Sequence, residues 1–264
     1  MRTFFSKLSN PAEHQQLPLI YPLIIALLAG AVFSLALAPY HYWWIALLSP
    51  ALLYATLSKR TPKQAFLIGW SYGIGLWFVG AFWLYTSIHV YGDTNALLSV
   101  LMIVIMALLM GLFTAIQTWL YRRFFPETPL TFAPLWVLFE WAKTWVFTGF
   151  PWLFAGYAFT ERFLDSYAPL FGIFGVSFVV ILLACALVEV LKKRIFWLIP
   201  SAILLLGAWG AAQLSFVTAK SEKPLSVSLI QGNIPQDLKW LTEYQIKTLE
   251  IYTRLTRTEW GRDI

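Results

Sequence analysis

The residues of this chain that are able to do chemistry are few and lie far apart. The one cysteine, Cys185, stands in the middle of an apolar stretch. An apolar setting makes a thiol unreactive, so we predict that Cys185 packs in a core and is not a nucleophile. The three histidines have no Cys, His or carboxylate at ligand spacing, and we therefore expect no metal site and no cofactor.

Two charges inside another apolar stretch form a second candidate. Glu140 lies deep in residues 131–148, and Lys143 follows three positions later, within reach on the same helix face. Charges at such a depth in a membrane are costly and face a bundle interior or a cavity. Two interpretations stay open: an internal Glu140–Lys143 ion pair that fixes helix packing, or a polar wall of a lipid-binding cavity.

Aromatic side chains are unusually dense, with 14 Trp, 12 Tyr and 21 Phe. Most of them are typical of the aromatic belt at a membrane interface. Three clusters, at 82–87, 148–153 and 239–240, instead converge on one predicted side of the membrane. Their candidate binding residues are Trp83, Tyr85, Phe150, Pro151, Trp152 and Trp240. We interpret these clusters as an aromatic mouth that admits acyl chains.

Composition places the elements that carry these residues in a membrane. The chain is 59% hydrophobic and 12% charged, with a mean hydropathy of +0.67, whereas a soluble domain is about 25% charged. A membrane-spanning helix needs roughly 20 apolar residues. Seven apolar stretches are predicted as spans: 19–37, 42–57, 65–88, 96–121, 131–148, 167–191 and 195–216. The expected fold is an all-α polytopic bundle of about seven transmembrane helices.

The distribution of Lys and Arg predicts the orientation of this bundle. Basic residues precede the first span and fill alternate loops at 59–63, 122–123 and 192–194, while the other loops hold only Arg162. Because positive loops stay cytoplasmic, we expect a cytoplasmic N-terminus and place residues after about 218 outside. The net charge of +6 comes largely from these loop ends. Nucleic-acid binding needs a basic face on a soluble domain, so we expect none.

The last part of the chain has a different character. Residues 220–224 are a polar linker, 225–230 alternate like a strand, and 232–235 form a turn. Apolar residues within 246–255 then follow one helical stripe. We therefore divide the chain into a transmembrane domain, 1–218, and the start of an α/β domain, 219–264. One strand and one helix are too little to bury a core.

At these motifs the sequence resembles the bacterial apolipoprotein N-acyltransferases over essentially its whole length. The matching segments are Ala38-Pro39-Tyr40, Trp83-x-Tyr85-x-Ser87-Ile88, Glu140-x-x-x-x-Trp145-x-x-Thr148-Gly149-Phe150-Pro151-Trp152-Leu153 and Gln231-Gly232-Asn233-Ile234-Pro235-Gln236-x-x-Lys239-Trp240. The last two together are specific. Lys143 departs from the family, which usually has Arg at this position, and so keeps the charge but loses the guanidinium fork.

The resemblance implies a membrane bundle followed by a nitrilase-like domain in the periplasm, in the inner membrane of a bacterium. It implies transfer of an acyl chain from a phospholipid to the α-amino group of a lipoprotein's N-terminal diacylglyceryl cysteine, through a thioester on a catalytic Cys with a Glu base and a Lys. Those three residues belong to the part of the family pattern that follows Ile264, so we expect this chain alone to be inactive and to need a missing C-terminal half. By the same resemblance, Trp240 matches a functionally important Trp, and Phe150 to Trp152 match the loop beneath the active site.

Two other classes of function stay open. A membrane transporter or lipid flippase would use the same bundle, with Glu140 as its working charge, but has no need of the tail around Trp240. A non-catalytic remnant, or one half of a split gene, would follow from the missing catalytic residues.

Overall fold

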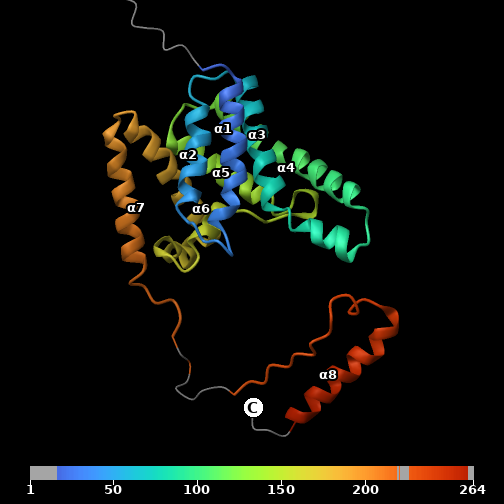
Figure 1. Ribbon diagram of the computed structural model, residues 1–264. Helices are drawn as coiled ribbons and strands as arrows, with labels where there is room; N and C mark the ends of the chain where they lie inside the picture. Colours follow the sequence, from blue (N-terminus) through green and yellow to red (C-terminus); the bar gives the residue numbers. More distant parts are fainter. Residues whose placement is uncertain (1–16, 219, 221–225, 261–264) are drawn as a thin grey trace, which may run out of the picture. The chain divides into compact units, whose positions relative to one another are not determined.

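The computed structural model describes residues 17–218, 220 and 226–260 (Figure 1). The fold is helical, and none of these described residues belongs to a strand. The chain divides into two compact units, one ending at Leu214 and the other beginning at Ser215. Each unit is described by itself.

Between residues 17 and 214, the described part of the first unit, there are seven α-helices, one overlapping each of the seven predicted apolar stretches. They are α1 (Ile20–Phe33), α2 (Ile45–Thr56), α3 (Pro62–Gly80), α4 (Ala96–Phe124), α5 (Pro129–Ala142), α6 (Ala168–Leu191) and α7 (Leu198–Ala211). Two helical segments of the described residues, Ala96–Phe124 and Phe163–Leu191, are long and apolar enough to cross a membrane. Together with shorter apolar helices, they indicate a membrane protein.

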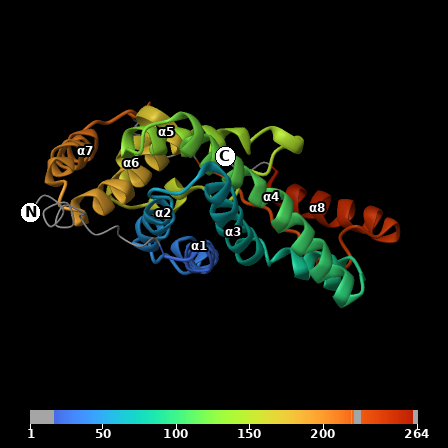
Figure 2. The ribbon, with the colours of Figure 1, turned by 90° about the horizontal axis from the view of Figure 1, so that it is seen from above.

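The helices pack as a ring in the order α1, α2, α6, α5, α4 and α3, and α7 packs against α6 outside it (Figures 1 and 2). The tightest neighbours, α3 and α4, meet through small residues. A Cβ added to Gly73 of α3 would lie 2.6 Å from the Cα of Gly111 in α4. The Gly69-x-x-x-Gly73 spacing thus allows the two backbones to approach closely.

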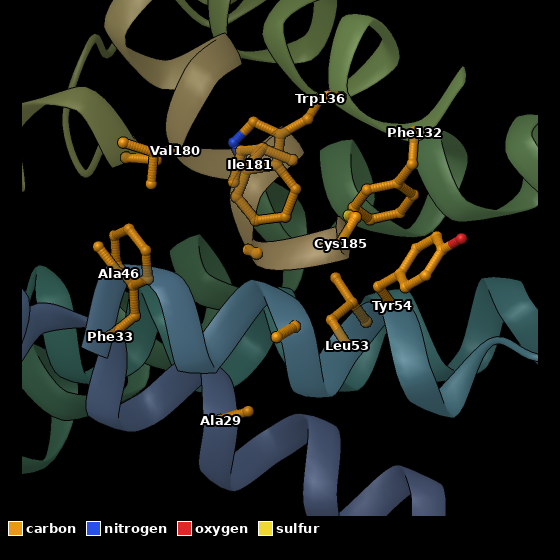
Figure 3. Packing of buried hydrophobic residues seen from close by; sticks show 14 of the residues in the cluster. Ala29, Phe33, Ala46, Leu53, Tyr54, Phe132, Trp136, Val180, Ile181 and Cys185 are labelled. Carbon is orange, nitrogen blue, oxygen red and sulfur yellow. The ribbon is translucent and has the colours of Figure 1, made fainter. Parts of the chain in front are cut away.

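The core of the ring is apolar and includes Cys185. This residue is 0% exposed and lies on α6 close to Tyr54 of α2 and Phe132 of α5 (Figure 3). The prediction that Cys185 lies in a core is confirmed. The outside of the ring is apolar as well, because large hydrophobic side chains such as Leu97, Ile105 and Leu109 of α4 are exposed. Exposed apolar surface of this extent is typical of contact with lipid.

Three helices end five or more residues before their apolar stretches do. Helix α3 ends at Gly80 instead of 88, and the chain continues through a turn into a π-helical segment, η3 (Thr86–Tyr91). Helix α5 ends at Ala142 instead of 148, where the backbone enters a loop with positive φ angles. Helix α7 ends at Ala211 instead of 216. The residues that follow each of these helix ends are still apolar, so composition alone did not show where the helices end.

The second unit contains a short 3₁₀ helix, η8 (Thr242–Tyr244), followed by α8 (Gln245–Glu259). Helix α8 covers the predicted helical stripe. The predicted strand is not found in its described part, 226–230, and Leu225 lies outside the described residues. A strand exists only when a neighbour accepts and donates its backbone hydrogen bonds, and none of residues 226–260 is buried.

Candidate functional site

Residues 143–156, the first part of the connection between α5 and α6, form the loop at the centre of the candidate site. It reverses direction through four residues with positive φ: Phe147 at 54°, Thr148 at 72°, Gly149 at 89° and Leu153 at 62°. A Cβ added to Gly149 would lie 2.2 Å from the backbone oxygen of Thr144. Glycine therefore allows both the backbone angle and the close approach that this turn requires.

Buried polar groups of α5 and α6 hold the far end of the 143–156 loop. Glu140 is 1% exposed, and its Oε1 accepts hydrogen bonds from Trp136 Nε1 at 2.9 Å and from the backbone N–H of Ala155 at 2.8 Å. The next N–H, of Gly156, donates to Oγ of Ser177 at 2.9 Å. Two loop amides that would otherwise be buried without acceptors are thereby satisfied.

Lys143 anchors the near end of this loop and does not form a direct ion pair with Glu140. Its backbone oxygen accepts from Phe150 N–H at 2.7 Å, and its ammonium lies 5.6 Å from the Trp77 ring centre and 5.2 Å from that of Phe154. No ion pair between Glu140 and Lys143 is present among the described residues. The two opposite charges still attract each other across a longer distance, but Oε1 of Glu140 accepts from the loop, and the ammonium lies over aromatic faces.

The structure brings two of the three predicted aromatic clusters together. The ring centres of Trp83 and Trp152 are 5.5 Å apart, those of Trp152 and Phe150 are 6.0 Å apart, and Phe150 reaches Trp77 at 5.2 Å. Trp83 and Trp152 are 48% and 49% exposed, so this row of rings has one open face. We call these four residues the aromatic row.

The other predicted residues lie beside or apart from the aromatic row. Tyr85 stacks on Phe82 with ring centres 5.7 Å apart, and Pro151 is exposed between two members of the row. Trp240 belongs to the second unit, where it is 80% exposed and Lys239 Nζ lies 5.5 Å from its ring centre. The prediction that Trp240 joins the mouth stays a prediction.

Sequence reasoning missed several residues of this site. Trp136 lies four residues before Glu140, so both side chains are on the same face of α5. This spacing could have been read from the sequence. Trp77 and Ser177 come from other helices, so no local pattern pointed to them. Among the residues that the structure describes, no group of three His, Cys, Asp or Glu side chains is placed to hold a metal ion.

The helical ring and its apolar outside indicate a membrane protein, and its candidate site combines a buried carboxylate with an aromatic loop. Residues 29–186, more than half of the chain, match the family model of the apolipoprotein N-acyltransferase N-terminal domain. The chain belongs to the apolipoprotein N-acyltransferase family. The matched region includes Glu140 and the whole 143–156 loop.

Individual relatives agree with this assignment. The chain is 35% identical over 247 residues to an apolipoprotein N-acyltransferase of Vibrio parahaemolyticus, which covers 91% of this chain and 49% of the relative. It is 40% identical over 244 residues to the one of Azotobacter vinelandii, covering 88% of this chain and 47% of the relative. The chain is 36% identical over 252 residues to the apolipoprotein N-acyltransferase of Coxiella burnetii, and this match covers 91% of this chain and 52% of the relative. The chain spans about half the length of the curated relatives it matches.

Proposed function

We propose that this chain is the membrane-embedded part of an enzyme that transfers an acyl chain from a phospholipid to the α-amino group of a lipoprotein's N-terminal diacylglyceryl cysteine. The observation that carries the proposal is the aromatic row above a buried carboxylate, in a region that matches this acyltransferase family. Acyl chains are apolar, and burying their CH₂ groups against aromatic faces is favourable by about 0.8 kcal/mol for each group.

Each site residue has a proposed role in this reaction. Trp83, Tyr85, Phe150, Pro151 and Trp152 form the wall of the mouth that receives the acyl chain. Glu140 is too buried to be an open wall, and instead it holds the 143–156 loop so that Phe150 and Trp152 keep their places. Trp240, in the second unit, contacts the substrates from the side of a nitrilase-like domain that begins with residues 219–264.

The covalent step needs residues that we do not assign within these 264 positions. A thioester mechanism uses a thiolate with a neighbouring base and positive charge or donors for the tetrahedral intermediate. The one cysteine, Cys185, is fully buried among apolar side chains. We therefore propose that residues 1–264 bind lipid but transfer no acyl chain by themselves, and that a C-terminal half supplies the catalytic Glu, Lys and Cys.

The proposed location is the bacterial inner membrane. The basic residues at 59–63, 122–123 and 192–194 all lie at or next to helix ends of the first unit, and their alternation supports seven crossings with a cytoplasmic N-terminus. Residues after about 218 are then periplasmic. With this orientation, the aromatic row belongs to the periplasmic end of the first unit.

A chimera tests the proposal. Residues 1–264 are joined to the remaining C-terminal half of the Vibrio parahaemolyticus relative and reconstituted with phospholipid and a diacylglyceryl-cysteine peptide. Mass spectrometry should detect triacylated peptide with the chimera and none with residues 1–264 alone. Trp83→Ala and Trp152→Ala should each slow the transfer about tenfold, equivalent to about 1.4 kcal/mol.

The matched control is Trp209→Ala, which removes an exposed tryptophan of α7 outside the ring. It should leave the rate unchanged. An inactive chimera, beside an active intact relative, would refute the proposed reaction. Equal losses in Trp83→Ala and Trp209→Ala would refute the proposed mouth but not the reaction. Product formed by residues 1–264 alone would refute the need for a C-terminal half.

A further inference from the structure

A polar pocket lies at the other end of the helical ring from the 143–156 loop, where α2, α4 and α6 end. Its volume is about 460 Å³, and its walls include Tyr54, Tyr121, Lys59, Lys192 and Arg194. The acyl-transfer site does not use any of these residues. The lining holds three basic side chains, Lys59, Lys192 and Arg194, and two carboxylates, Glu127 and Glu189. The adjoining segments 58–63, 122–127 and 189–194 contain five more Lys and Arg residues.

The two carboxylates of the pocket already have partners. Glu189 is buried; its Oε1 accepts from Lys192 Nζ at 3.0 Å and from Tyr54 OH at 3.2 Å, and its Oε2 accepts from Arg194 Nη1 at 2.6 Å. Glu127 pairs with Arg122. An Arg side chain has five N–H donors and a Lys has three. Arg194 and Lys192 therefore keep donors that Glu189 does not occupy.

Tyr121 supplies a second and independent sign of a ligand. Its side chain lines the pocket and is 1% exposed; its hydroxyl has no hydrogen-bond partner within 3.5 Å among the described residues, and the hydroxyl of Tyr54 is the neighbouring polar group. An unsatisfied buried hydroxyl costs about 1–3 kcal/mol, so such groups in folded proteins normally meet a ligand or an ordered water.

We propose that this pocket binds a phosphate-bearing anion through Lys192, Arg194 and the hydroxyl of Tyr121. Phosphate oxygens accept hydrogen bonds from all three groups, and charge-assisted bonds of this kind are strong. The ends of α2, α4 and α6 that meet here carry partial negative charge, but the excess of basic residues outweighs it. A cation is therefore disfavoured, and a polar wall of this kind does not suit an apolar ligand.

The headgroup of an anionic phospholipid and a soluble phosphate ester share this chemistry. Basic pockets between the ends of transmembrane helices lie at the depth of lipid headgroups and bind them. The pocket lies at helix ends that carry the basic loops, so a lipid headgroup in the adjoining leaflet reaches it without crossing the apolar core.

Binding to the purified chain in neutral detergent tests the proposal, by native mass spectrometry with phosphatidylglycerol and by competition with glycerol phosphate. The double variant Lys192→Gln/Arg194→Gln should weaken phosphatidylglycerol binding at least tenfold. The control Lys193→Gln removes a neighbouring exposed lysine that is not part of the wall and should bind as the unaltered chain does. If the chain binds phosphatidylglycerol and glycerol phosphate does not displace it, the pocket is a site for a lipid headgroup. If glycerol phosphate displaces the lipid, the pocket recognises the phosphate ester itself.

Because Lys192 and Arg194 also bind Glu189, the double variant loses stability as well, and Tyr121→Phe separates the two effects. Without ligand, Tyr121→Phe should melt at the same temperature as the unaltered chain or higher, because an unsatisfied hydroxyl has been removed. The affinity of Tyr121→Phe for phosphatidylglycerol should be several-fold lower than that of the unaltered chain. The proposal is overturned if neither phosphatidylglycerol nor glycerol phosphate binds the unaltered chain. It is also overturned if Tyr121→Phe binds phosphatidylglycerol as tightly as the control Lys193→Gln does.

Discussion

Glu140 should stabilise the first unit mainly as a hydrogen-bond acceptor for the 143–156 loop. Replacing it by alanine leaves two buried donors, Trp136 Nε1 and the N–H of Ala155, without their acceptor. At about 2 kcal/mol for each orphaned donor, the loss is about 4 kcal/mol. A unit of this size changes its melting temperature by about 2–4 °C for each kcal/mol, so Glu140→Ala should melt about 8–16 °C lower.

Glu140→Gln is the matched variant, because its amide oxygen can take the place of Oε1 and accept the same two hydrogen bonds. A neutral acceptor is weaker than a charged one, so Glu140→Gln should lose less than about 1.5 kcal/mol. The assay is thermal unfolding of the purified chain in detergent, combined with limited proteolysis of the loop. Melting temperatures of the two variants within about 2 °C of each other would refute the role of Glu140 as an acceptor for the loop.

Four further predictions concern other positions. Gly149→Ala should lower the free energy of unfolding by about 1–3 kcal/mol, because φ is 89° and the new Cβ meets Thr144 O at 2.2 Å. Gly210→Ala has nothing within 4 Å of its Cβ and should be neutral or stabilising by up to about 1 kcal/mol in the same unfolding assay. Cys185→Ser should destabilise the chain by about 1–3 kcal/mol by burying a hydroxyl in an apolar core, yet leave acyl transfer per folded chimera unchanged; a complete loss of transfer would make Cys185 the nucleophile. Reporter fusions after Lys63 and after Lys223 should report opposite sides of the membrane, and the same side for both would contradict the predicted orientation.

The sequence by itself determined which segments are helical in the first unit and what surrounds them. Seven apolar stretches each contain a helix, because their length and composition leave few other ways to satisfy the backbone. The burial of Cys185 followed from its apolar neighbours, and the motifs around Glu140 and Trp240 were enough to indicate the family. These properties depend on composition and local order, which a sequence displays directly.

Only the tertiary structure decided where the helices end and what Glu140 binds. The i, i+3 spacing of Glu140 and Lys143 allowed a direct ion pair. In the structure, however, the carboxylate of Glu140 accepts a hydrogen bond from the N–H of Ala155, fifteen residues later. The ammonium of Lys143 lies over aromatic rings from α3 and from the loop. The strand expected at 225–230 also depends on a neighbour that is distant in sequence or in another part of the protein. In each case the partner is chosen by packing between segments far apart in the chain, and local spacing carries no information about that choice.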